Sequence, residues 1–129
     1  MYTEQKQAVV DSQSSYEDDR ERRFDRVMTQ QSLHDENVLY AGTFGLSQNN
    51  RSCGFVPGYL HATTGVYVIS RFADGSPAPV HLLDGLPESW IEERGKGGHV
   101  TKTCPGIVPG FLLDGRFYTR EEALNFAAQ

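Results

Sequence analysis

Several features that mark particular protein classes are scarce in this 129-residue sequence. It has two cysteines, too few for a disulfide framework, and no apolar run near the roughly 18 residues of a membrane-spanning helix. It has no basic excess either, because the formal net charge is −5 at pH 7. Nucleic acid and anionic membranes select basic surfaces, so this charge balance disfavours both as partners.

The start of the chain also lacks a basic stretch followed by an apolar one. We therefore expect no secretory signal, and a cytoplasmic location. In that compartment two cysteines are expected to remain free thiols.

Charge is unevenly distributed along the chain. Residues 1–36 hold nine acidic and five basic residues, whereas residues 37–129 hold eight and seven. Residues 1–14 are polar, which is typical of flexible segments. The sequence therefore predicts a polar, flexible arm with a charged helix over residues 1–36, and a single folded domain over residues 37–129, which is long enough to bury a core.

The helix predicted in the arm has one thin apolar face. Ser15 is its expected N-cap, and acidic residues precede the arginines, an order that complements the helix macrodipole. The apolar side chains near one helical face are those of Tyr16, Phe24, Val27 and Met28. This face is either the apolar side of a solvated helix or a docking surface for a partner protein or a second copy of the chain.

Short apolar stretches alternate with turn residues in the rest of the chain, as in antiparallel sheets. Strands are predicted at residues 37–44, 53–60, 66–70, 107–113 and 116–118. Residues 80–83 are predicted as a short strand or an extended segment, and residues 87–93 as a short helix. Asp114 and Gly115 form a hairpin-turn sequence, and Thr119 with Glu122 predicts a capping box at the start of a C-terminal helix.

The predicted fold is α+β. It consists of a small, twisted antiparallel sheet of about four or five strands, a C-terminal helix packed on the sheet, and a separate N-terminal helix.

One pattern occurs twice in the predicted domain. Residues 56–60 read VPGYL and residues 108–112 read VPGFL, and each is followed by a turn and an aromatic strand. Proline in a strand indicates an edge or a bulge, and glycine beside it suits a close backbone approach. We expect two similar hairpins in one sheet. The side chains expected to line a groove between them are those of Pro57, Tyr59, Pro109 and Phe111.

Residues able to bind metal or act as nucleophiles are present without the usual spacing. They are Cys53, Cys104, His61, His81 and His99. No two of them have the short spacing of a zinc-ligand pair, and a catalytic thiol would need a histidine within hydrogen-bond reach. The sequence therefore predicts no metal site, no cofactor and no catalytic residue.

Other common site signatures also have simpler explanations. Asp74, Asp84 and Asp114 each precede glycine, which predicts turns more strongly than acid–base catalysis. Residues 95–98 (GKGG) lack the glycine spacing and the Lys-Ser/Thr ending of a phosphate-binding loop.

A nucleic-acid interface is the second possibility considered. Arginines cluster at residues 20–26, but acidic residues alternate with them, which favours ion pairs within a helix. Aromatic side chains on a sheet can stack bases. The candidates are Tyr59, Tyr67, Phe111, Phe117 and Tyr118, and the basic residues near them in the sequence are few.

Two blocks resemble stretches of a known group of proteins. Residues 70–87 (SRFADGSPAPVHLLDGLP) and 110–123 (GFLLDGRFYTREEA) are similar to stretches in small uncharacterised bacterial proteins of plasmids, prophages and integrative elements. The likeness covers about residues 54–128. It implies an accessory role in a mobile element and no particular activity.

These observations favour a non-enzymatic protein that binds another protein, as an accessory or inhibitory factor of a bacterial mobile element or phage. The alternatives are a small nucleic-acid-associated regulator and an enzyme of unknown class. The expected partner is another protein or a second copy of the chain, and no membrane is expected as a partner.

Overall fold

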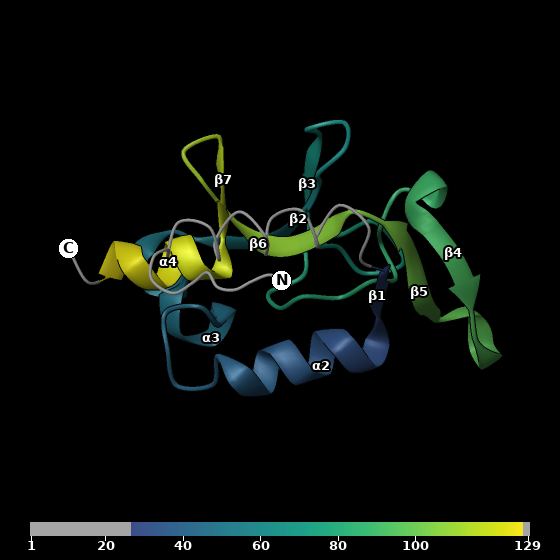
Figure 1. Ribbon diagram of the computed structural model, residues 1–129, viewed down its shortest axis with the longest axis horizontal. Coiled ribbons are helices and arrows are strands. Elements are labelled where there is room, and N and C mark those ends of the chain that lie inside the picture. Colours follow the sequence, from purple (N-terminus) through teal and green to yellow (C-terminus); the bar gives the residue numbers. More distant parts are fainter. Residues whose placement is uncertain (1–26, 128–129) are drawn as a thin grey trace, which may run out of the picture.

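The computed structural model describes residues 27–127, and its fold is α+β with antiparallel sheets, as predicted (Figure 1). The predicted flexible segment, Tyr16, Phe24 and most of the predicted N-terminal helix lie outside the described residues. No helix within the described range is long and apolar enough to cross a membrane.

The described residues form seven strands and three α-helices. In chain order these are β1 (Val27–Thr29), α2 (Gln30–Leu39), α3 (Ser47–Asn50), β2 (Val56–His61), β3 (Tyr67–Ile69), β4 (Ile91–Arg94), β5 (Val100–Pro105), β6 (Ile107–Leu113), β7 (Arg116–Thr119) and α4 (Arg120–Ala127). Three 3-10 turns are η1 (Arg51–Cys53), η2 (Glu88–Trp90) and η3 (Lys96–Gly98).

The strands form two sheets, where the sequence had predicted one. The four-stranded sheet has the order β3-β2-β6-β7, and the three-stranded sheet has the order β1-β5-β4. Strand β5 passes almost directly into β6 through Pro105 and Gly106, and the positive φ of Gly106 (91°) turns the chain there. This corner lets one continuous segment serve both sheets.

The two VPG segments pair with each other at the centre of the four-stranded sheet. Gly58 lies opposite Gly110, and the pairing is symmetric on either side of them: Pro57 lies opposite Phe111, and Tyr59 opposite Pro109. The predicted pair of similar hairpins in one sheet is therefore present, as β2–β3 and β6–β7, related by a local two-fold axis through the glycine pair.

The alternation of side chains along this central pair separates a core face from an opposite face. Tyr59 and Phe111 lie on the core face and are fully buried. On the opposite face the glycines leave room for the side chains of neighbouring strands. Leu112 packs over Gly58, and Phe117 packs over Gly110.

Helix α2 occupies part of a stretch that was predicted as a strand, residues 37–44. Its start is fixed by a capping box: the Thr29 hydroxyl accepts from Ser32 N (3.0 Å), and the Ser32 hydroxyl accepts from Thr29 N (2.9 Å). Leu33 packs into the core from this helix. The cap and this contact outweigh the β-propensity of Val38, and the helix ends before Tyr40.

The segment before α2 is also different from the prediction. Val27 and Met28 are in strand β1, which pairs with β5, and so they are not on the face of a helix. Met28 is buried in the main core cluster. The boundary predicted between residues 36 and 37 thus falls inside α2, and both β1 and α2 pack with the rest of the described residues.

Smaller differences concern the loops between the sheets. Residues 80–83 form no strand, and the chain bends at Val80 and Leu83. The helix predicted at 87–93 is a single 3-10 turn, η2, after which the chain enters β4. Cys53 lies in η1, ahead of β2 and not within it.

The C-terminal hairpin and helix agree with the sequence. Asp114 and Gly115 both have positive φ (53° and 76°) and form the turn between β6 and β7. In the capping box of α4, Thr119 N donates to the Glu122 carboxylate (2.9 Å), and the Thr119 hydroxyl accepts from Glu122 N (3.1 Å). Ala123 packs against the strands beneath in a second core cluster with Phe55 and Phe111.

We predict that Gly110→Ala destabilises the protein by about 1–3 kcal/mol, the cost of overpacking a tight site. A Cβ at this position would clash with the Phe117 ring and with the backbone carbonyl of Tyr118, which cannot move without breaking the β6–β7 pairing. The local symmetry predicts a similar cost for Gly58→Ala. Urea denaturation measures both, and an unchanged midpoint for either variant would contradict this account of the central pair.

We also predict that Thr119→Ala costs about 1 kcal/mol of stability, because it leaves the backbone N–H of Glu122 without its acceptor. Thr119→Ser is the matched control, since it keeps the hydroxyl and should lie within a few tenths of a kcal/mol of the parent. Equal denaturation midpoints for the two variants would show that the cap does not stabilise α4.

Candidate functional site

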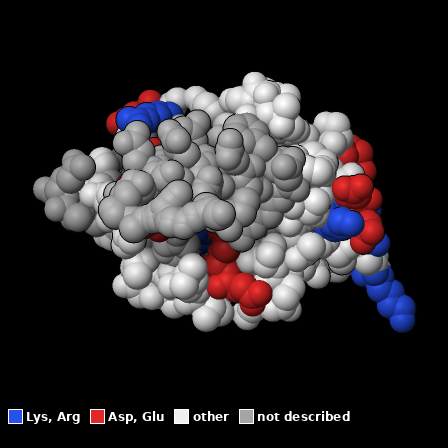
Figure 2. Space-filling view, viewed as in Figure 1, with Lys and Arg blue, Asp and Glu red and all other residues white. Residues whose placement is uncertain are grey.

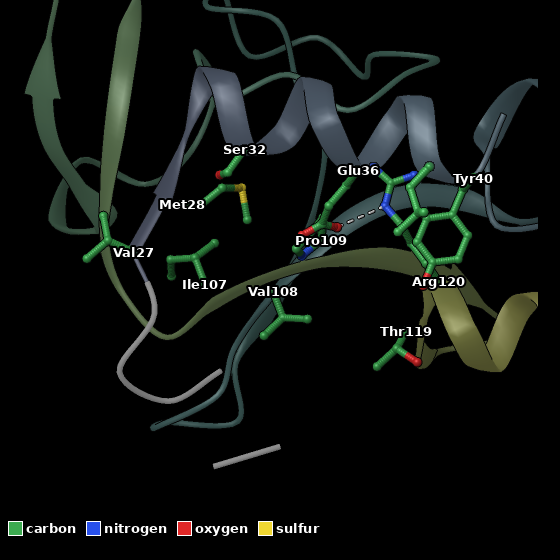
Figure 3. Close-up of a pocket in the computed structure, with 11 residues that line it drawn as sticks. Val27, Met28, Ser32, Glu36, Tyr40, Ile107, Val108, Pro109, Thr119 and Arg120 are labelled. Carbon is green, nitrogen blue, oxygen red and sulfur yellow. Dashed lines mark ion pairs between the residues drawn. The ribbon is translucent and has the colours of Figure 1, made fainter. Parts of the chain in front are cut away.

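The candidate site is a pocket between α2 and β6 with a cavity volume of about 150 Å³ (Figure 3). It is lined by Val27, Met28, Ser32, Glu36, Leu39, Tyr40, Ile107, Val108, Pro109, Thr119 and Arg120. In Figure 3, Val27, Met28 and Ile107 lie toward one end, and Glu36, Tyr40 and Arg120 toward the other. The pocket therefore has an aliphatic end and a charged end.

The pocket exists because β7 is shorter than β6. Strand β7 pairs with β6 only as far as Gly110, opposite Thr119, and then turns into α4. Residues 107–109 of β6 consequently have no neighbouring strand on that side within the described sheets. Pro109 suits this position because it has no backbone N–H to leave unpaired. Strand β1 and helix α2 lie over the gap, and the pocket is the space between them.

The charged end is organised by Arg120, the first residue of α4, which is only 3% exposed. Its guanidinium donates from Nη1 to the Gly45 carbonyl (2.9 Å) and from Nη2 to Asn37 Oδ1 (2.6 Å). Its Nε lies 3.4 Å from Glu36 Oε1, an ion pair longer than the roughly 2.7–2.9 Å of a charge-assisted hydrogen bond. Burial lowers the pKa of Arg120, while Glu36 opposes this change; an arginine nevertheless stays charged at neutral pH.

His81 continues this polar network into the core. Its Nδ1 lies 3.3 Å from Arg120 Nη2, and its Nε2 lies 2.7 Å from the Gly110 carbonyl oxygen. Since an arginine can only donate, Nδ1 must be the acceptor and Nε2 carries the proton, so the imidazole is neutral. Burial and the adjacent Arg120 charge lower the pKa of His81 to about 3. Its ring also packs edge-on against Tyr59 and Phe111, and so connects the two core clusters.

At the charged end, Glu36 has unoccupied hydrogen-bond acceptor sites. Its side chain is 29% exposed, and among residues 27–127 its carboxylate forms an ion pair with Arg120 alone. A carboxylate offers about four lone-pair sites, so most of this capacity is available. Figure 2 shows acidic side chains gathered over α2, in the lower centre of the view. The Glu36 carboxylate therefore belongs both to the pocket lining and, with Asp35, to the acidic residues of α2.

The structure buries some of the predicted binding residues in the core and places others in the pocket lining. Tyr59 and Phe111 are fully buried in the core and line no groove. Pro109 lines the pocket, whereas Pro57 is buried at the other end of the sheet pairing. Val27 and Met28 also line the pocket, although from a strand.

The residues that complete the site were not predicted from the sequence. Glu36 and Arg120 are separated by more than eighty residues, and the sequence gives no signal that joins them. Leu39, on the rim of the pocket, was placed in a predicted strand. The capping box of α2, with a threonine three residues before Ser32, was the one available sign that this stretch is helical.

The structure does bring one thiol and one imidazole together. Cys104 Sγ lies 4.0 Å from His61 Nε2, and Trp90 packs edge-on against His61. Burial raises the pKa of Cys104, which favours the thiol over the nucleophilic thiolate. Both cysteines are free, as predicted. Within residues 27–127, no group of three or more His, Cys, Asp or Glu side chains is arranged to hold a metal ion.

The three aspartates have structural roles. Asp74 accepts from the backbone N–H (2.9 Å) and the hydroxyl of Ser76, which closes a turn and lowers its pKa. Asp114 forms the β6–β7 turn. Asp84 accepts from Val100 N (2.9 Å) and contacts His99 Nδ1 (2.8 Å), and so ties the loop before η2 to β5.

The aromatic and basic residues proposed for base stacking do not form one surface. Tyr59 and Phe111 are inaccessible. Of the basic residues near them, Lys102 forms an ion pair with Glu93 (3.8 Å), and Arg116 lies over the Tyr118 ring (4.7 Å). In Figure 2 the basic side chains near β4 and β5 accordingly lie beside acidic ones.

Comparison with protein-family models, with curated proteins and with solved structures finds no match.

We predict that His81 makes the protein less stable as the pH falls below about 6.5, the pKa of histidine in an unfolded chain. Below that pH the unfolded state takes up a proton, whereas the native imidazole, with a pKa of about 3, does not. Protonation therefore favours unfolding, by about 2 kcal/mol between pH 7 and pH 5. Urea denaturation at both pH values measures it.

His81→Gln is the reference for this experiment. Glutamine keeps one donor and one acceptor but does not titrate. The other histidines titrate in both proteins, so the difference between the two pH dependences isolates His81. Equal dependences would mean that His81 is protonated as readily in the native state as in the unfolded one.

Proposed function

We propose that this chain is a non-enzymatic protein-binding module that recognises its partner at the α2–β6 pocket. The observation that carries the proposal is the pair of large apolar side chains at the end of α2. Val38 is 61% exposed and Leu39 is 74% exposed, and Leu39 borders the pocket. Burying such side chains on a partner contributes roughly 1.5–3 kcal/mol each, so exposed neighbours beside a cavity favour association.

The size of the pocket supports a side chain of a partner as its occupant. Small-molecule and cofactor sites usually measure about 300–1,000 Å³. A cavity of about 150 Å³ is too small for a nucleotide or a flavin and suits one amino-acid side chain. Recognition of one anchoring side chain in a pocket, with apolar contacts around it, is the usual energetic pattern of a protein–protein interface.

The mobile-element setting rests on the resemblance of residues 70–87 and 110–123. These residues form part of the scaffold: the second block contains β7 and the start of α4, which holds Arg120. On this resemblance we propose that the chain is an accessory or inhibitory factor of a bacterial mobile element or phage.

The test is affinity capture from a lysate of the native host with the full chain and with the double variant Val38→Ser/Leu39→Ser. Both side chains are exposed, so the melting temperature should change little, while retention of the partner should fall at least about tenfold.

Val66→Ser is the matched control for this capture. Val66 is 52% exposed in the turn between β2 and β3, which lies on the opposite side of the molecule from α2 in Figure 1. This variant should retain the partner. Equal retention by the double variant and the parent would place the interface elsewhere and overturn the proposal.

A further inference from the structure

The shape and charge of the pocket also indicate which side chain it takes. An occupant must cover apolar walls formed by Ile107, Val108 and Pro109 and must also satisfy the carboxylate of Glu36 at the other end. An aliphatic chain that ends in a cation has both properties. A carboxylate or phosphate does not, because Glu36 would repel it.

Arg120 does not supply a site for an anion. Its guanidinium contacts Gly45, Asn37 and His81. It also lies over the Tyr40 ring, and its charged contact among the described residues is Glu36. The guanidinium is therefore used by contacts within the protein. Its effect on a ligand is to orient the Glu36 carboxylate by holding Oε1.

The geometry also distinguishes between the two basic side chains. Arginine binds carboxylates best through two parallel hydrogen bonds to both oxygens. Here Oε1 already faces Arg120 Nε, so only one oxygen of Glu36 is fully available. A lysine ammonium is a compact point charge that needs one oxygen, and its four-carbon stem matches an apolar wall.

We propose that the pocket binds a lysine side chain of a partner protein, with its methylenes against Ile107–Pro109 and its ammonium on Glu36. This inference rests on the proposed function, since it names the anchor of the same interface. The acidic surface over α2 would attract a basic segment around that lysine (Figure 2).

The test uses the full chain and N-acetyl-lysinamide as the probe, with binding followed by NMR of the methyl groups of Leu39, Ile107 and Val108. N-acetyl-norleucinamide is the comparison, because it has a similar stem and no ammonium. We expect the lysine probe to bind about tenfold more tightly than norleucine, the order of one charge-assisted hydrogen bond. N-acetyl-argininamide should bind more weakly than the lysine probe.

Two matched variants separate the role of Glu36 from a general charge effect. Glu36→Gln keeps an acceptor for Arg120 and should remove the preference for lysine while it leaves norleucine binding unchanged, which also shows that the pocket is intact. Asp35→Asn removes the same charge one residue away, outside the pocket lining, and should keep the preference.

Three outcomes would overturn the inference. The first is equal affinity for the lysine and norleucine probes. The second is an equal loss of the lysine preference in Glu36→Gln and Asp35→Asn. The third is binding of the lysine probe that appears only after Arg20, Arg22, Arg23 and Arg26 are replaced by serine. The last would mean that the arginines of this chain occupy the pocket. Capture that depends on Val38 and Leu39 without lysine binding would leave the proposed function intact and reject only the anchor.

Discussion

The buried guanidinium of Arg120 is the interaction on which the arrangement of the elements depends. It contacts α2 through Glu36 and Asn37, the following loop through Gly45, and the core through His81. A buried charge is strongly destabilising when its partners are removed, even though a buried ion pair adds little net stability. These contacts therefore specify one position of α2 over the sheet more than they add to the free energy of folding.

The pocket follows from the same arrangement. Helix α4 begins where β7 leaves the sheet, which places Arg120 beside the uncovered part of β6. Arg120 forms an ion pair with Glu36, which is the one carboxylate among the described residues that line the pocket. This ion pair orients the Glu36 side chain. The exposed Leu39 lies three residues further along the same helix and so reaches the rim. The site is thus built from contacts that also maintain the fold.

Local signals in the sequence predicted local structure well. The Asp114–Gly115 turn and the capping box of Thr119 involve residues at most three positions apart, and their geometry depends little on the rest of the chain. The repeated VPG segments predicted two hairpins in one sheet, because both copies carry the same proline and glycine constraints. The division of the strands into two sheets depends on the corner at Pro105 and Gly106. A Pro-Gly pair marks a turn, but it does not show that the strands before and after it belong to different sheets.

The helix α2 and the charged end of the pocket could not be predicted in the same way. Residues 38–44 include several strand formers, such as Val38, Tyr40 and Phe44. Packing of Leu33 and the cap at Thr29 nevertheless keep the chain helical as far as residue 39. Arg120 looked like an ordinary charged residue in the first turn of a helix. Its partners are 75, 83 and 39 residues away, and a single sequence does not reveal such long-range pairs.

The symmetric pairing of β2 with β6 has a consequence for folding. Each hairpin is local, but the central pair joins segments about fifty residues apart and must close a long loop that contains β4 and β5. Until it closes, both VPG strands present an open edge. Their sequences are nearly the same, so the register that joins Gly58 to Gly110 also suits two copies of either strand from different chains. The protein is therefore most exposed to strand exchange with other copies of the chain before this pair closes.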